Sequence, residues 1–131
     1  MTKQSEALKK AVEIIKDKYP DIWAIYLFGS FDTPYERVDS DLDLAILLDR
    51  TVDALALWEL SQNIATLLNI DVQLIDLRQA STVFQNEIIR DERRIYCSHP
   101  KECNELESIY LAMYLRLNEE RKEILDDLKK A

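Results

Sequence analysis

Two aspartates, Asp41 and Asp43, stand one residue apart at the start of an apolar run that ends at Leu48. Side chains two residues apart on a strand point to the same face, so these carboxylates would lie side by side. Like charges this close repel each other unless a cation or a proton relieves them. Mg²⁺ suits such a pair because it binds carboxylate and phosphate oxygens together. The alternative interpretation of an isolated Asp-x-Asp is a solvated strand edge.

A single glycine, Gly29, directly follows a short apolar run and precedes Ser30. Average composition would give roughly nine glycines in a chain of this size. Glycine lets the backbone turn sharply and approach a ligand closely, and the following N–H groups and the Ser30 hydroxyl could then donate to a phosphate. The alternative is an ordinary tight turn.

A third acidic residue, Asp71, opens a later alternating run that ends at Leu77. If that strand pairs beside the one that carries Asp41 and Asp43, Asp71 faces the same site and completes a carboxylate triad. Asp76 has the opposite parity and points to the other face. We expect Asp76 to lie in solvent at the end of the strand.

Hydrophobic periodicity predicts the elements that position these residues. Helices are expected at 5–18, 52–68, 82–91 and from Pro100 almost to the C-terminus, and strands at 22–28, 41–48, 70–77 and 94–97. The polar residues 31–40 are expected to form a loop. Trp23 and Trp58 are expected in the core. The order α-β-β-α-β-α-β-α predicts an α+β fold with a mixed sheet flanked by helices. Residues 1–98 would form one domain, and 99–131 a C-terminal helix packed on that domain or on a partner.

Composition excludes several classes of protein. Seventeen Lys and Arg against 25 Asp and Glu give a net charge of −8, which disfavours stable binding to nucleic acid. The chain has no apolar stretch of the roughly 20 residues that cross a membrane, and no signal-peptide pattern, so we expect a cytoplasmic location. Cys97, His99 and Cys103 match no standard zinc motif.

The combined pattern of strand, Gly29-Ser30, ten residues, Asp41-x-Asp43, strand and then Asp71 resembles the nucleotidyltransferases related to DNA polymerase beta. The short chain is similar to the minimal, MNT-domain antitoxins that are encoded beside HEPN-domain RNase toxins. The resemblance covers roughly residues 8–97.

This resemblance implies a nucleotidyltransferase-like fold and an Mg²⁺-dependent transfer of AMP from ATP to a tyrosine of a HEPN toxin. By the same resemblance, Asp41, Asp43 and Asp71 would be the catalytic, metal-binding carboxylates for two Mg²⁺ ions. Gly29, Ser30 and Ser40 would bind the nucleotide.

The sequence departs from the family pattern just after Gly-Ser. Many members have Arg-Gly there, whereas this chain has Asp32 and Thr33. Arg37, Arg78 or a base of a partner could replace the missing arginine. Two other functions stay open: an antitoxin that neutralises its toxin by binding alone, and a nucleotidyltransferase for a small molecule such as an aminoglycoside.

Overall fold

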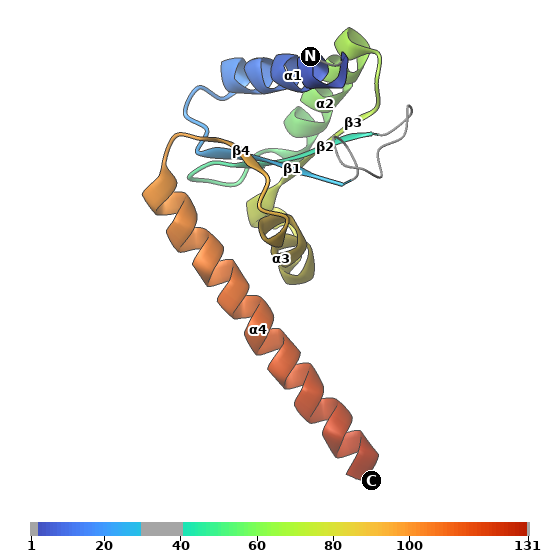
Figure 1. Ribbon diagram of the computed structural model, residues 1–131, viewed down its shortest axis with the longest axis vertical. Coiled ribbons are helices and arrows are strands. Elements are labelled where there is room, and N and C mark those ends of the chain that lie inside the picture. Colours follow the sequence, from blue (N-terminus) through green and yellow to red (C-terminus); the bar gives the residue numbers. More distant parts are fainter. Residues whose placement is uncertain (1–2, 30–40, 131) are drawn as a thin grey trace.

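The protein is built on one four-stranded mixed sheet with helices on both faces (Figure 1). The structure, a computed structural model, describes residues 3–29 and 41–130. The elements in chain order are α1 Lys3–Lys18, β1 Ala24–Phe28, β2 Leu42–Leu47, α2 Ala54–Leu68, β3 Val72–Asp76, the 3₁₀ turn η1 Leu77–Gln79, α3 Thr82–Arg90, β4 Arg94–Cys97 and α4 Pro100–Lys130. The predicted fold class and order of elements are confirmed.

The strand order is β3-β2-β1-β4. β1 pairs antiparallel with β2 and with β4, whereas β2 and β3 run parallel. Because a parallel pair needs a crossover connection, α2 lies between β2 and β3 along the chain. β3 therefore lies at one edge of the sheet. The side of β3 that faces away from β2 has no strand neighbour in the described part of the chain.

Each face of the sheet buries its own apolar cluster. α1 and α2 cover one face, where Leu42, Leu44 and Ile46 are fully buried. α3 and the first turns of α4 cover the other, against Tyr26, Ala45 and Leu47. Figure 1 shows these two helical layers above and below the sheet. Alternation along β2 thus sends Asp43 to the α3 side.

The helix α4 is tied to the sheet only near its start. Cys103 and Tyr110 are buried in the cluster on the α3 side. The Tyr26 hydroxyl donates to Glu107 Oε2 at 3.1 Å, and Arg94 Nη1 donates to the same oxygen at 2.5 Å. Beyond these contacts the helix projects away from the body (Figure 1).

The outer part of α4 exposes several apolar side chains, among them Met113, Ile124 and Leu128. Trp58 was also expected in the core, and this is wrong, because it is 59% exposed on α2. The buried stripe of α2 consists of Leu57, Leu60, Ser61 and Ile64.

No helix in the described residues is long and apolar enough to cross a membrane.

Candidate active site

The glycine turn and the aspartate pair meet at one end of the β1–β2 hairpin. The antiparallel register places Phe28 opposite Asp43, so Gly29 begins its turn beside the Asp43 side chain. Gly29 has a φ of +78°, in the left-handed region that residues with a side chain rarely adopt. The single glycine of the chain therefore stands where the backbone conformation requires it.

The space beside Gly29 is filled by the Asp43 carboxylate. A Cβ atom built on Gly29 would lie 2.5 Å from Asp43 Oδ2, closer than any real contact allows. The missing side chain lets backbone and carboxylate approach each other directly. A phosphate held by the turn would thus lie next to the carboxylate, an arrangement that requires a cation between the two negative groups.

The electrostatics of Asp43 agree with a cation site. Asp43 is half-buried, whereas its neighbour Asp41 is exposed. Burial, and secondly the charge of Asp41, raise the pKa of the Asp43 carboxyl above its ordinary value. A metal ion would relieve both effects, because it replaces lost hydration and neutralises the repulsion. Leu42 and Leu44 are buried on the opposite face, as the alternation predicted.

The third predicted carboxylate, Asp71, lies beside the start of β2. Its carbonyl oxygen accepts a hydrogen bond of 2.8 Å from the Leu42 backbone N–H, and its side chain is exposed. The parallel register places Gln73, not Asp71, next to Asp43. Within residues 3–29 and 41–130, no three His, Cys, Asp or Glu side chains gather closely enough to hold a metal ion. By alternation Asp71 has the parity of the pair, and its role as a third carboxylate stays a prediction.

Gln73 is the polar neighbour that the sequence analysis overlooked. Gln73 carries no charge and does not stand out in the sequence, but its spacing of two residues from Asp71 places both side chains on one face. Gln73 lines a cavity of about 640 Å³ together with Gly29, Asp43, Phe84 and Arg90. The Phe84 ring packs edge-on against Phe28, with 5.3 Å between the ring centroids, and helps to form the apolar wall.

Two arginines at the end of α3 and after it lie near the glycine turn. Arg93 Nη2 donates to the Gly29 carbonyl oxygen at 2.6 Å and to Asp91 Oδ2 at 3.1 Å. Arg90 lines the cavity described above. Arg90 and Arg93 are therefore two positively charged side chains at the candidate site.

Arg78, one of the sequence-based candidates for a phosphate-binding base, lies elsewhere. Its Nε atom donates to the Leu48 carbonyl oxygen at 2.6 Å, beyond the end of β2 that is remote from Asp43. The guanidinium group lies 5.5 Å from the centre of the Trp23 ring. Arg37, Ser30 and Ser40 lie outside the described residues, so their predicted roles stay predictions.

The expectation for Asp76 is corrected. Its side chain is buried, and its two carboxylate oxygens accept hydrogen bonds from the backbone N–H groups of Val52, at 2.8 Å, and Arg78, at 3.0 Å. These bonds replace hydration, which explains why a carboxylate can be buried there. The residue fixes the connections after β2 and β3 and takes no part in the site.

The residues of the zinc alternative have other partners. The His99 ring stacks on Trp23 with 5.5 Å between the ring centroids, and its Nδ1 atom shares a hydrogen bond of 2.7 Å with the Ser98 hydroxyl. Burial raises the pKa of the Cys103 thiol to about 12, and its interaction with Cys97 adds to this effect. A thiol that resists ionisation is a poor metal ligand.

A left-handed glycine beside a carboxylate pair is an arrangement that could hold a phosphate through a cation, and comparison with known proteins specifies the class. The family model described as polymerase beta, nucleotidyltransferase, matches residues 9–101. The chain therefore belongs to this family of nucleotidyltransferases, in agreement with the resemblance seen in the sequence.

Several of the similar proteins are adenylyltransferases or components of toxin–antitoxin complexes. The protein adenylyltransferase MntA of Shewanella oneidensis is 36% identical over 120 residues, which cover 91% of this chain and 85% of MntA. A crystal structure of the toxin–antitoxin with AMP-PNP matches with a TM-score of 0.77 at 35% identity, covering 92% of this chain and 97% of that chain.

A further structure contains the tri-AMPylated HEPN toxin of Shewanella oneidensis in complex with its MNT antitoxin. It matches with a TM-score of 0.75 at 34% identity and covers 96% of this chain and 98% of the matched chain. The likeness therefore extends through α4 and is not confined to the catalytic core.

Proposed function

We propose that this protein is an antitoxin that transfers AMP from ATP to a tyrosine hydroxyl of a cognate HEPN-domain toxin and thereby neutralises it. The observation that carries the proposal is the close approach of Gly29 and Asp43 across the β1–β2 hairpin, which brings the glycine turn against a carboxylate pair. The family membership and the AMPylated toxin found with a related antitoxin support it. Because the reaction consumes ATP, we place it in the cytoplasm.

The proposed reaction is an in-line displacement at phosphorus. The tyrosine oxygen forms a bond to the α-phosphorus of ATP while the bond from that phosphorus to the bridging oxygen of the β-phosphate breaks. Pyrophosphate leaves with those electrons, and the hydroxyl proton passes to a carboxylate or to water. Bound Mg²⁺, two ions by family analogy, would supply charge neutralisation for the phosphates.

The residues of this chain would position the reactants. Asp41 and Asp43 would hold the metal, and Gly29, Ser30 and Ser40 would bind the nucleotide. Asp71 remains our predicted third carboxylate, available as a metal ligand or as the acceptor of the hydroxyl proton. Its exposed position beside the carboxylate pair is compatible with either role.

The experiment is transfer of radiolabelled AMP from ATP to the purified cognate toxin in the presence of Mg²⁺. Asp41→Asn and Asp43→Asn should each abolish labelling, whereas Asp49→Asn should not. Asp49 is a matched control because it lies just beyond the other end of β2 and pairs in solvent with Arg50 at 2.9 Å. A folded wild-type protein that leaves the toxin unlabelled contradicts the proposal.

Neutralisation by binding alone is the second candidate, favoured by the exposed apolar residues of α4, which could contact a partner. The net charge of −8 would complement a basic, RNA-binding toxin. The same variants separate the two mechanisms. If Asp41→Asn still neutralises the toxin without labelling it, binding is the mechanism.

A further inference from the structure

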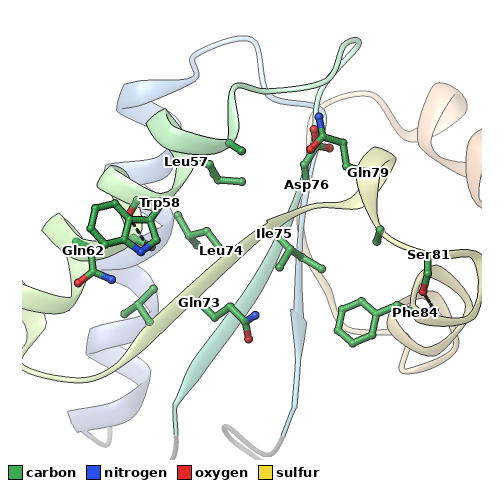
Figure 2. Close-up of a pocket in the computed structure, with 14 residues that line it drawn as sticks. Leu57, Trp58, Gln62, Gln73, Leu74, Ile75, Asp76, Gln79, Ser81 and Phe84 are labelled. Carbon is green, nitrogen blue, oxygen red and sulfur yellow. Dashed lines mark hydrogen bonds between the residues drawn. The ribbon is translucent and has the colours of Figure 1, made fainter.

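We propose that a groove along the open edge of β3 receives an extended segment of the acceptor protein and presents its tyrosine to the nucleotide site. This inference deepens the proposed function and rests on it. We define the β3 groove by its walls, α2 on one side and the start of α3 on the other, with β3 between them (Figure 2).

The β3 groove is large enough to receive a side chain of a bound polypeptide. Its volume is about 630 Å³, within the range of roughly 300–1,000 Å³ that ligand sites occupy. Figure 2 shows Trp58 and Gln62 of α2 facing Ile75 of β3 and Phe84 of α3 across it. Since β3 is an edge strand of the described sheet, an extended segment can also pair with its outer backbone groups, as in binding by β-augmentation.

The chemistry of the lining favours an uncharged, aromatic occupant. Among the described residues that line the groove, Asp76 alone is ionisable, and its carboxylate already accepts two backbone hydrogen bonds. These residues include no lysine or arginine, so they offer no positive charge to a triphosphate. Trp58, exposed by 59%, and Phe84 instead present the aromatic surfaces that anchor polypeptide side chains such as tyrosine.

The β3 groove is continuous with the candidate active site. Gln73 and Phe84 line both the β3 groove and the cavity that contains Gly29 and Asp43. Gln73 is also the cross-strand neighbour of Asp43. A tyrosine that lies in the β3 groove therefore meets the Gln73 amide before it reaches the carboxylate pair. That amide can both donate to and accept from the incoming hydroxyl.

The kinetic test compares Trp58→Ala with Leu67→Ala. Both residues are exposed apolar side chains of α2, at 59% and 70%, but only Trp58 lines the β3 groove. We expect Trp58→Ala to raise the KM for the toxin by about tenfold or more, as for the loss of an aromatic anchor. Its affinity for Mg²⁺ and AMP-PNP should stay unchanged, and Leu67→Ala should alter neither quantity.

A second measurement does not depend on turnover. A photoreactive benzoylphenylalanine replaces Trp58 in one protein and Leu67 in another, and each is irradiated with the toxin. Cross-linking at position 58 to the tyrosine-bearing segment, and none at position 67, supports the inference even where no AMP is transferred. Failure of the wild-type protein to transfer AMP would then count against the proposed function alone.

Three results would overturn the inference. One is an unchanged KM for Trp58→Ala in a folded protein that transfers AMP. Another is the absence of a cross-link between position 58 and the toxin. The last is a cross-link to a second copy of this chain, accompanied by dimerisation in light scattering, which would make the β3 groove a surface for self-association.

Discussion

At position 29, a side chain would compete with the Asp43 carboxylate for the same space. Glycine meets two separate requirements at this position, because it accepts a positive φ and leaves room for Asp43 Oδ2. The requirement for glycine is therefore both conformational and steric. Either effect alone would penalise a side chain at this position.

We predict that Gly29→Ala displaces the Asp43 carboxylate and abolishes AMP transfer. The left-handed backbone should cost an alanine about 1–2 kcal/mol of folding free energy, which a protein of this size can sustain. Urea unfolding and the transfer assay measure the two effects separately. Wild-type transfer by a folded Gly29→Ala protein would show that the close approach is not needed.

A second prediction at this scale concerns Asp43 and pH. Because burial and Asp41 raise its pKa, the folded state disfavours the ionised carboxyl. The associated stabilisation is complete only below the ordinary aspartate value of about 3.9 and is lost as the pH rises through the raised pKa. At pH 7 without metal, Asp43→Asn should therefore raise the Tm by a few degrees.

Scanning calorimetry at several pH values, with and without Mg²⁺, tests this prediction. The gain in Tm should shrink as the pH is lowered, and Mg²⁺ should stabilise the wild-type protein more than Asp43→Asn, since a ligand stabilises the state that binds it. The control Asp49→Asn should respond to Mg²⁺ as the wild type does. An Asp43→Asn protein that is less stable than the wild type at pH 7 would contradict the electrostatic argument.

The chemistry of individual residues was predictable where it depends on parity along one strand. The pairing of Asp41 with Asp43, and the opposite orientation of Asp76, both follow from alternation. The burial of Asp76 did not, because one of its partners is the N–H group of Val52, 24 residues away along the chain. The proximity of Gln73 to Asp43 likewise depends on the register between two strands.

At the scale of elements, apolar runs and alternation identified all four strands of the described sheet, and amphipathic periodicity identified the helices. Trp58 shows the limit of that reasoning. Amphipathic spacing indicates which face of a helix is apolar, but it does not say whether neighbouring elements are wide enough to cover that face. In this protein α2 covers the sheet beside β3 and leaves Trp58 in the β3 groove.

The attachment of α4 to the sheet gives a prediction at this scale. Glu107 accepts hydrogen bonds from both Tyr26 and Arg94. Glu107→Ala would leave the Tyr26 hydroxyl and the Arg94 guanidinium without this partner, at a cost of about 1–3 kcal/mol in unfolding free energy. Urea denaturation measures the loss, and Glu105→Ala, an exposed site on the same helix, is the matched control.

A compensating change sharpens that measurement. Tyr26→Phe in the Glu107→Ala background removes the unpaired hydroxyl and should recover part of the lost stability. Equal stability of Glu107→Ala and the wild-type protein would show that the apolar contacts of Cys103 and Tyr110 hold α4 by themselves.

At the scale of the whole molecule, the surfaces have distinct characters. One end of the sheet carries the glycine turn and the carboxylate pair. The open edge beside it presents aromatic side chains and, among the described lining residues, no cation. The outer part of α4 presents apolar side chains. Composition and net charge describe the average of these surfaces, so they disfavoured nucleic acid as a partner but could not locate a protein-binding face.

The hairpin register has a consequence for how such a protein can diversify. Gly29 and Asp43 are held opposite each other by the β1–β2 ladder, from Ala24 with Leu47 to Phe28 with Asp43. The spacing between the glycine and the carboxylate is therefore a property of the ladder itself. A slip of this register by one residue would turn the Asp43 side chain to the opposite face of the sheet, so insertions or deletions within either strand should not be tolerated.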